Sequence, residues 1–312
     1  MVASILTITM NPSIDVSAST ENVVPVRKLR CSEVRRDPGG GGINVARVIQ
    51  RLGGNCRVLY PAGGSSGHLL HRLLDQESIP RIPIDVVADT RDSFTILEKT
   101  SGDQYRFVLP GPELSEGEWQ TCLDRIASKG GKAGYLVASG SLPQGVPDDF
   151  YARVARIAKS IGARLILDTS GRALLPALEE GVYAIKPNLR ELKELTGMSL
   201  DNQSEWVGEA ENLVHSGKTE VVALTLGEGG ALLVSNGVQI RASAIPVKVV
   251  SAVGAGDSFL AAFAWHLGAG GILQNAFRYG VAAGTAALLS PGTELCKKED
   301  LEGLFQEVIL TE

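Results

Sequence analysis

Short runs of apolar residues alternate with amphipathic stretches along this chain from about residue 40 onward. The apolar runs predict buried strands over residues 57–60, 135–138, 164–167, 184–185 and 221–224. The stretches between them predict helices over residues 43–52, 69–76, 150–161, 191–195 and 206–215. Such alternation favours a mostly parallel sheet with helices on both faces, so α/β is the expected fold class. The apolar residues within 1–10 predict a first strand.

Two segments, at residues 15–36 and 93–109, interrupt this alternation. In the second, Phe94-Thr-Ile-Leu-Glu98 and Gln104-Tyr-Arg-Phe-Val108 flank a turn formed by Thr100-Ser-Gly-Asp103. We expect both segments to form antiparallel ribbons that project from the main domain. A small sheet of this kind has an apolar face that needs a cover, either the substrate cleft or a second copy of the same sheet.

The composition excludes several classes of protein. With 312 residues, of which 44% are hydrophobic and 21% charged, the chain is long enough for a large core. Its net charge of −5 gives no basic footprint for nucleic acid or an anionic membrane. Its four cysteines are widely scattered, which indicates free thiols in a reducing compartment. The first residues lack the features of a signal peptide or membrane span, so we expect a cytoplasmic protein.

The most informative motif is Gly254-Ala255-Gly256-Asp257, which precedes a helical run at residues 258–263. The glycines let backbone N–H groups converge, and the start of a helix adds the positive end of its dipole, so the motif predicts an anion hole. A carboxylate there would repel the anion unless its task is to accept a proton while the amides hold developing charge. This arrangement indicates phosphoryl transfer to a hydroxyl. The alternative is that Asp257 only caps the helix.

A second glycine-rich motif, Gly39-Gly40-Gly41-Gly42-Ile43-Asn44, lies where a ribbon ends and a helix begins. Its amides could approach a ligand closely, and Asn44 offers both a donor and an acceptor. It is not a dinucleotide fingerprint, because a GxGxxG pattern would require glycine at position 44. The alternative is a flexible connector.

A rival hypothesis comes from Gly63-Gly-Ser65-Ser-Gly67, which fits the GxSxG pattern between a strand and a helix. With His215 and His266 downstream, it keeps open a serine hydrolase that uses Ser65 as its nucleophile.

Three further groups of polar residues follow predicted strands. Lys186-Pro-Asn188 is followed one helical turn later by Glu191, and oxygen ligands of this kind suit Mg²⁺. The alternative is a helix with Pro187 at its first position and Asn188 as a capping residue. The turn from Thr225 to Gly230 follows another strand and is either a ligand loop or a hairpin. Asp15 closes the first strand, and Lys28 and Arg91 are single basic residues near the ribbons; most such residues are turn residues or solvated ones.

Together these motifs resemble those of the ribokinase-like, or PfkB, carbohydrate kinase family, in the expected order and over essentially the whole chain. The segments 38–47, 104–111, 139–143 and 186–188 are similar to those of its bacterial 6-phosphofructokinases. The resemblance implies a single domain over residues 1–312 with a three-layer α/β/α fold and a mostly parallel central sheet. It also implies a small projecting β-sheet lid, formed by residues at about 13–36 and 90–109.

The activity that this resemblance implies is ATP-dependent phosphorylation of the C1 hydroxyl of fructose 6-phosphate, a step of glycolysis. Tagatose-6-phosphate kinases and 1-phosphofructokinases of the same family remain alternatives. They commonly carry lysine where this chain has Gly41, which favours fructose 6-phosphate, whereas Asn11-Pro-Ser-Ile-Asp15 suits all three activities.

The family motifs also imply roles for individual residues. Asp257 would be the general base, and Gly254, Ala255, Gly256 and Lys186 would complete the catalytic group. The sugar phosphate would be bound by Asp15, Gly40, Gly41, Gly42, Asn44, Arg91, Ser141 and Lys28, the last of which could reach over from a neighbouring subunit. ATP would be bound by Lys186, Asn188, Thr225, Gly227, Gly230 and Gly256.

Metal ions and a partner copy are implied in the same way. Asn188 and Glu191 would hold Mg²⁺ indirectly, and a monovalent cation, K⁺, would lie at Ser251, Val253, Ala287, Ser290 and Gly292. Glu294 stands where the resemblance leads us to expect a basic residue, which puts that cation site in doubt. Two lids would clasp to form a homodimer, and neither nucleic acid nor membrane is an expected partner.

Overall fold

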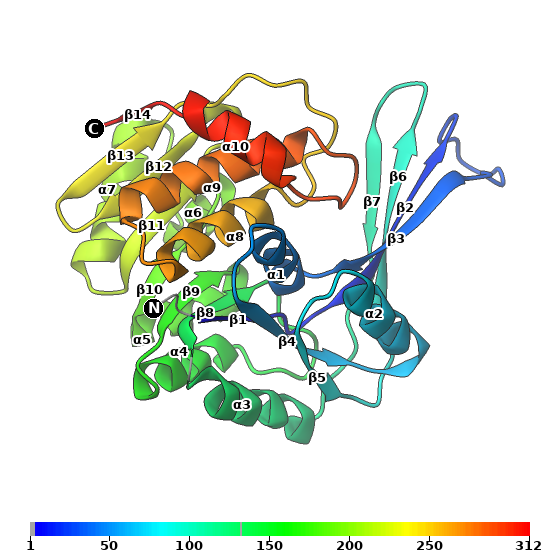
Figure 1. The fold of residues 1–312 in the computed structure, drawn as a ribbon, viewed down its shortest axis with the longest axis horizontal. Helices are drawn as coiled ribbons and strands as arrows, with labels where there is room; N and C mark the ends of the chain where they lie inside the picture. The colour runs from blue at the N-terminus through cyan, green and yellow to red at the C-terminus, as the bar shows by residue number, and fades with distance from the viewer. Residues whose placement is uncertain (1–3, 132) are drawn as a thin grey trace.

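The computed structural model describes residues 4–131 and 133–312, and its centre is a ten-stranded sheet (Figure 1). The strands follow the order β14 (Leu310–Thr311), β13 (Val238–Ala242), β12 (Ala231–Ser235), β11 (Thr219–Thr225), β10 (Val182–Ile185), β9 (Arg164–Asp168), β8 (Ala133–Ser139), β1 (Ser4–Ile8), β4 (Cys56–Ala62) and β5 (Arg81–Asp85). The seven strands from β11 to β5 are parallel, and β12, β13 and β14 are antiparallel additions at one end.

The predicted strands and the parallel sheet are confirmed. Each of the five apolar runs lies within one of β4, β8, β9, β10 and β11, and the first strand is β1. The hairpin offered as the alternative for Thr225 to Gly230 is also confirmed. The chain turns back after β11 through a short 3-10 helix at Gly227–Gly229, so that Thr225 pairs with Ala231. The further antiparallel strands β13 and β14 were not predicted.

Ten helices in the described part of the chain cover the two faces of this sheet. One face carries α1 (Gly41–Arg51), α2 (Gly64–Gln76), α8 (Ala255–Gly268), α9 (Leu273–Leu288) and α10 (Lys298–Glu307). The other carries α3 (Glu116–Gly130), α4 (Phe150–Ser160), α5 (Leu174–Glu180), α6 (Leu189–Thr196) and α7 (Gln203–His215), and a 3-10 helix at Gly171–Ala173 leads into α5. None of the described helices is long and apolar enough to cross a membrane.

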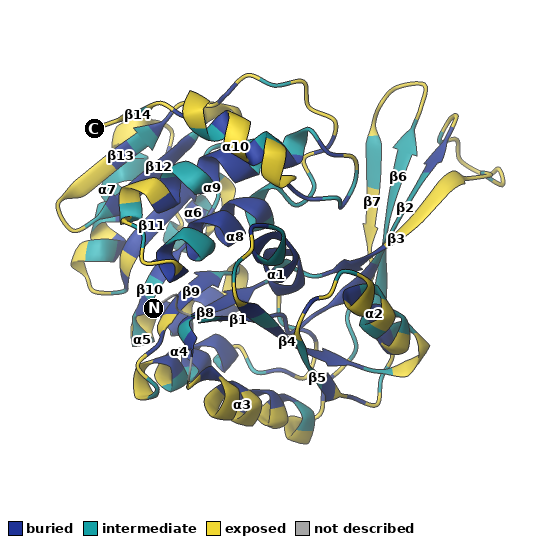
Figure 2. Ribbon diagram, viewed as in Figure 1, coloured by how far each residue is buried: buried dark blue, intermediate teal, exposed yellow. Residues whose placement is uncertain are grey.

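Strand periodicity divides the apolar residues between two hydrophobic cores. In β8, Tyr135 and Val137 pack beneath α1 and α8, whereas Leu136 and Ala138 face α3 and α4. A strand that is buried on both faces needs a continuous apolar run, which is the pattern that predicted these strands. Helix α8 lies between α1 and α9 and is buried on most sides, so its residues 258–264 are all buried (Figure 2).

The two ribbons join into one four-stranded sheet, which we call the lid. Its order is β3 (Ser32–Gly39), β2 (Ser13–Thr20), β6 (Arg91–Glu98) and β7 (Gln104–Val108). The antiparallel pairs β2–β3 and β6–β7 are confirmed, and the parallel pairing of β2 with β6, which joins them, was not predicted. The lid projects beyond the body, and its strands are mainly half-buried or exposed (Figure 2).

Two helical glycines should respond in opposite ways to replacement by alanine, because only Gly42 in α1 packs tightly against β1. A Cβ at Gly42 would lie 2.3 Å from the Ile8 carbonyl oxygen, whereas a Cβ at Gly208 in α7 would meet nothing within 4 Å. Gly42→Ala should therefore lower the free energy of unfolding by about 1–3 kcal/mol, although alanine is the better helix former. Gly208→Ala should raise it by about 0.5–1 kcal/mol. Urea unfolding followed by circular dichroism measures both, and a stabilised Gly42→Ala protein would contradict the packing described here.

Candidate active site

Three polar side chains meet where neighbouring strands end. Ser139 ends β8, Asp168 ends β9 and Lys186 follows β10, and the parallel order of these strands brings all three to one edge of the sheet. Ser139 and Asp168 are paired in register, and the Ser139 hydroxyl lies 3.4 Å from Asp168 Oδ2. Lys186 is buried, and its Nζ lies 3.2 Å from Asp168 Oδ1.

Helix α8 begins opposite these strand ends and carries Asp257 in its first turn. Gly254 precedes the helix with a φ of 78°, a left-handed conformation that favours glycine. Asp257 is the third residue of the helix, and no side chain caps this terminus, so the interpretation of Asp257 as a cap is wrong. Amides in a first helical turn lack acceptors within the helix, which leaves the N–H groups of Gly256 and Asp257 for an anion.

The Asp257 carboxylate is held from the side of α1. Asn44 Nδ2 donates to Asp257 Oδ2 at 2.9 Å, and the Ser139 hydroxyl lies 3.5 Å from Oδ1. Burial raises the pKa of Asp257 to about 6, helped by the nearby Asp168, while the Asn44 hydrogen bond and Lys186 act against this rise. A carboxylate whose pKa lies this close to neutrality is suited to accept a proton.

Lys186 supplies a positive charge beside the same helix turn. A Cβ added to Gly256 would lie 3.3 Å from Lys186 Nζ, so the ammonium group lies against the first turn of α8. Burial alone would lower the pKa of Lys186, but the carboxylates of Asp168, Glu191 and Asp257 together raise it. The lysine therefore stays charged where an anion would meet the α8 amides.

Steric limits explain the glycines that begin α1. Gly40 has a φ of 107°, and a Cβ at Gly41 would lie 2.2 Å from the Ser139 hydroxyl oxygen. The motif is therefore an ordered loop against the strand ends, and the alternative of a flexible connector is wrong. Gly42 packs directly on β1 and serves the fold.

Asp15, Arg91 and Ser141 lie where the lid joins the body. Ser13 donates to Asp15 at 2.7 Å, and burial raises the pKa of Asp15 despite this hydrogen bond and the charge of Arg91. Arg91 donates to the Asn11 carbonyl oxygen at 3.1 Å, and Asn11 Nδ2 donates to the Ser141 hydroxyl at 3.2 Å. Asn11 thus brings two of the predicted sugar-phosphate residues together, although it was not itself predicted.

Lys28 does not join this group within one copy of the chain. In the pairing of β2 with β6, Arg91 lies opposite Ser13 at the base of the lid. Lys28 lies in the exposed loop beyond Thr20, where β2 ends. Any role of Lys28 in this site therefore requires a second copy, as the prediction allowed.

A pocket of about 660 Å³ opens beside the first turn of α8. Its polar edge includes the predicted Asn188, Thr225, Gly227, Gly230 and Gly256, and its walls are apolar side chains from 245–249, α8 and α9. Thr225 N donates to the Pro187 carbonyl oxygen at 3.0 Å. This hydrogen bond places the turn at residues 186–188 beside the turn at residues 225–230. A pocket with one polar edge and apolar walls suits a nucleotide base next to its phosphates.

Comparison with known proteins agrees with this geometry. Residues 5–300 match the model of the pfkB family carbohydrate kinases. The chain belongs to this family. It is 46% identical over 97% of its length, and 89% of the relative's, to ATP-dependent 6-phosphofructokinase isozyme 2 of Mycobacterium tuberculosis. It is 39% identical to the Escherichia coli protein of the same name, over 96% of this chain and 97% of that one.

Solved structures confirm the ribokinase-like fold expected of a PfkB protein. Phosphofructokinase-2 from Escherichia coli in complex with potassium matches with a TM-score of 0.94 and 39% identity, covering 98% of this chain and 99% of that one. The same enzyme in complex with fructose-6-phosphate matches with a TM-score of 0.92 and 37% identity, over the same shares of the two chains.

Asn188 and Glu191 have a structural task in this PfkB domain. The Asn188 side chain accepts from the Glu191 amide and Glu191 Oε2 accepts from the Asn188 amide, both at 2.9 Å, so they form a capping box on α6. The capping alternative is therefore confirmed, and it leaves Glu191 Oε1 outside the cap. Pro187 precedes this cap and does not occupy the first helical position.

The residues expected at the monovalent-cation site lie on the loop before α8, in the last turn of α9, which holds Ala287, and on the loop that follows α9. Val250 N and Ser251 N donate to the Leu288 carbonyl oxygen at 2.8 and 3.3 Å. Ser251 and Ser290 are buried, and Ser290 Oγ has no hydrogen-bond partner among the described residues. The lid reaches these loops, because Gln104 Nε2 lies 3.4 Å from the Val250 carbonyl oxygen.

Glu294, in the loop after Ser290, is held by charges of its own chain. Its side chain forms ion pairs with Arg35 of lid strand β3 and, at 3.7 Å, with Lys297. The lid and this loop are therefore joined in one copy of the chain at a position where a basic residue was expected.

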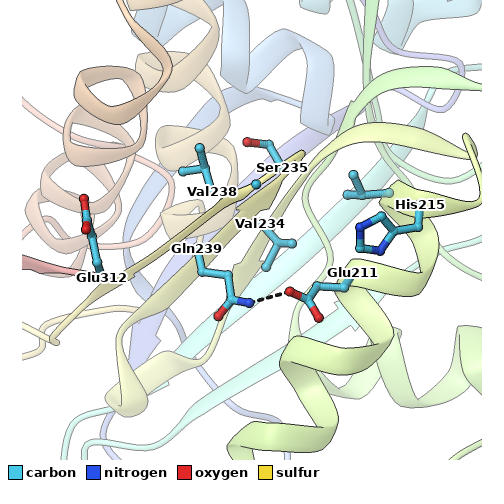
Figure 3. Close-up of a pocket in the computed structure, with 9 residues that line it drawn as sticks. Glu211, His215, Val234, Ser235, Val238, Gln239 and Glu312 are labelled. Carbon is cyan, nitrogen blue, oxygen red and sulfur yellow. Dashed lines mark hydrogen bonds between the residues drawn. The ribbon is translucent and has the colours of Figure 1, made fainter.

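Two other features of the chain lie away from this site. A cavity of about 420 Å³ lies at the opposite edge of the sheet. Its lining includes Gln239, which donates to Glu211 beside His215 (Figure 3). Ser65 follows β4 at the carboxyl edge, whereas His215 precedes β11 at the amino edge, and His266 packs against Tyr279 with ring centres 4.8 Å apart. The structure thus does not assemble the serine hydrolase site that GxSxG suggested.

Sequence reasoning also missed the roles of Asp168 and of the Ser139 hydroxyl in this site. Each ends a strand that was predicted, and the rule that parallel strands carry ligands at their carboxyl ends could have identified both.

The raised pKa of Asp257 predicts a pH-dependent cost to stability. The carboxyl has its usual pKa of 3.8 in the unfolded chain and a pKa of about 6 in the folded protein. The unfolded chain therefore loses its proton first, and the free energy of unfolding falls as the pH rises between these two values. Asp257→Asn should therefore raise the free energy of unfolding at pH 8 by about 1–3 kcal/mol, and the gain should disappear near pH 4. Urea unfolding at both pH values measures this. The exposed control Asp124→Asn should show no such pH dependence, and a destabilised Asp257→Asn protein at pH 8 would contradict the raised pKa.

Proposed function

We propose that this PfkB protein is an ATP-dependent 6-phosphofructokinase, which transfers the γ-phosphoryl group of ATP to the C1 hydroxyl of fructose 6-phosphate. The observation that carries the proposal is the position of Asp257. Its carboxylate is held by Asn44 beside the glycine-rich residues 39–42, which we call the sugar loop. The free amides of the same helix turn face the pocket proposed for the nucleotide. One turn of α8 thus offers a base to one substrate and an anion hole to the other.

The proposed reaction needs one proton transfer and one phosphoryl transfer. Asp257 accepts the proton of the C1 hydroxyl as its oxygen bonds to the γ-phosphorus, and the bond from that phosphorus to the bridging oxygen of ADP breaks. The α8 amides and Lys186 stabilise the charge on the transferring group. ADP, fructose 1,6-bisphosphate and a protonated Asp257 result, and the proton then leaves to solvent. No side-chain nucleophile takes part.

The choice of fructose 6-phosphate rests on the sugar loop and on the relatives. A side chain at position 41 would collide with the Ser139 hydroxyl in the present arrangement, so a lysine there would require a different loop. Arg91, whose Nε is buried without a hydrogen-bond partner among the described residues, and Ser141 would bind the 6-phosphate. The 1-phosphofructokinase of Bacillus subtilis is 33% identical, less than the two 6-phosphofructokinases.

ATP would occupy the pocket beside α8, with its base between the apolar walls and its phosphates toward Lys186. Asn188 and Glu191 would hold Mg²⁺ through water, and the described residues contain no cluster of three metal-ligating His, Cys, Asp or Glu side chains, so phosphate oxygens would complete its shell. The magnesium ion would neutralise phosphate charge when bound.

We assign the monovalent cation K⁺ to the loop of Ser251 and Val253, the end of α9 at Ala287 and the loop of Ser290 and Gly292. The partnerless, buried hydroxyl of Ser290 fits a hard cation, and the comparable Escherichia coli structure contains potassium. Since Glu294 is paired with Arg35, its charge is neutralised beside these loops.

The lid sheet exposes apolar side chains, and a homodimer in which two lids pack together would cover them. Val34, Phe107 and Val108 expose 53%, 54% and 60% of their surface on lid strands β3 and β7. Pairing of two lids would cover such residues and could bring Lys28 to the partner's Arg91. An Escherichia coli relative is also known in a tetrameric inhibited form, so larger assemblies are compatible with the fold. A cytoplasmic location remains a prediction.

Removing the base is the direct test of catalysis. Asp257→Asn should lower kcat by about 10²–10⁴-fold, because a general base contributes about that much, with little change in the affinity for ATP or fructose 6-phosphate. A coupled ADP-release assay measures turnover, and isothermal titration measures binding. Asp124→Asn serves as the control, and an unchanged kcat of Asp257→Asn would exclude this mechanism.

The substrate and the cation are tested by one panel of ADP-release assays. Fructose 6-phosphate should give a higher kcat/KM than tagatose 6-phosphate, fructose 1-phosphate or unphosphorylated fructose. Preference for fructose 1-phosphate would assign the 1-phosphofructokinase alternative.

The same assay tests the cation. K⁺ should increase the kcat/KM for fructose 6-phosphate relative to a larger organic cation. Equal rates with both cations would remove K⁺ from the proposal.

A further inference from the structure

A fully buried arginine lies one helical turn after Asn44. Arg47 has no exposed surface, and its Nη1 lies 3.5 Å from Asn44 Oδ1. This contact occupies the oxygen side of the amide, so that the NH₂ side is directed to Asp257. The reversed amide would place an oxygen against the Asp257 carboxylate and an NH₂ against a guanidinium, and both contacts would be unfavourable.

The Arg47 guanidinium is itself held by two acidic residues. Its Nε donates to both carboxylate oxygens of Glu77, at 2.9 and 3.0 Å, and its Nη2 lies 3.6 Å from Asp37 Oδ1. A buried charge with such partners is fixed in position, because moving it would leave a carboxylate unpaired in a dry environment. Asn44 is thus held by a group that cannot easily move.

Arg47 also connects the segments that surround the site. Its Nη1 donates to the carbonyl oxygens of Pro38, before the glycine motif, and Thr293, in the loop after Ser290, at 3.2 and 3.3 Å. Thr293 in turn donates to Asp37 at 2.8 Å. One side chain therefore contacts the end of β3 just before the glycine motif, the loop near the proposed cation site and the amide that meets Asp257.

We propose that Arg47 is a positioning residue, which fixes the amide of Asn44 and through it the protonation of Asp257. The role of Asp257 as a base rests on the proposed function, whereas the titration of its carboxylate does not. The charged and polar groups that face this carboxylate are Asn44 on α1, Ser139 on β8, Asp168 on β9, Lys186 after β10 and Asp15 on β2. Of these, Asn44 is the one that Arg47 contacts.

The chain offers a matched control in Arg51, one turn further along α1. Arg51 also pairs with Glu77, at 3.4 Å, and donates to the Glu294 and Cys296 carbonyl oxygens, but it has no recorded contact with Asn44. Lysine at either position keeps the positive charge and loses the planar fork. A difference between the two variants therefore reports the contact with Asn44 and not the charge.

The experiment is a carboxyl ¹³C NMR titration of Asp257 in the ligand-free protein, with its signal assigned by Asp257→Asn. Arg47→Lys should raise the pKa of Asp257 by about half a unit to one unit, since a less ordered Asn44 donates less well to the ionised form. Arg51→Lys should leave this pKa unchanged. In an Asn44→Ala background, Arg47→Lys should produce no further change.

Two outcomes would overturn the proposal: no shift in Arg47→Lys, or the same shift with and without Asn44. If Arg47→Lys does not fold, Glu77→Gln is measured in its place, because Glu77 holds the Arg47 guanidinium and does not itself contact Asn44. A pKa shift in Glu77→Gln no larger than that in Arg51→Lys would then overturn the proposal. The acid limb of kcat should move with the NMR pKa. An NMR shift without a matching kinetic shift would instead count against Asp257 as the base.

Discussion

The hydrogen bond from Asn44 in α1 to Asp257 in α8 joins two residues that lie 213 positions apart in the chain. It requires α1 and α8 to pack against each other over the carboxyl edge of the sheet, with the sugar loop at the start of one helix and the anion hole at the start of the other. The close approach of α1 to β1 at Gly42 and the burial of α8 on most sides both serve this placement. The site is therefore a consequence of how the helices on one face of the sheet pack.

A carboxylate in this position costs stability and supplies reactivity. Burial and Asp168 raise the pKa of Asp257, while Lys186 and Asn44 limit the rise. A pKa closer to neutrality makes a carboxylate a stronger base. Burial and the three neighbouring groups together leave the pKa of Asp257 at about 6, where the carboxyl is both ionised at neutral pH and more basic than usual.

Much of the fold followed from the sequence because the physical signals are local. A strand buried on both faces must be a continuous apolar run, as β8 and β11 are, and glycine motifs marked the loops that begin α1 and α8. The pairing of β2 with β6 could not be predicted in this way, because it joins two ribbons that are separate in the chain. Asp168 and Arg47 were missed for a related reason. Each is an ordinary charged residue in sequence, and only the spatial neighbours Lys186 and Asn44 give it a role.

In the proposed reaction, Asp257 faces the sugar hydroxyl while the amides of its own helix turn face the phosphoryl group. A crystal structure with ADP, Mg²⁺, fructose 6-phosphate and aluminium fluoride tests this arrangement, since the fluoride mimics the transferring group. We predict the fluoride at the N–H groups of Gly256 and Asp257, and the C1 oxygen at about 2.6–3.2 Å from the Asp257 carboxylate. A C1 oxygen beyond hydrogen-bond reach of Asp257, with the fluoride away from the start of α8, would contradict it.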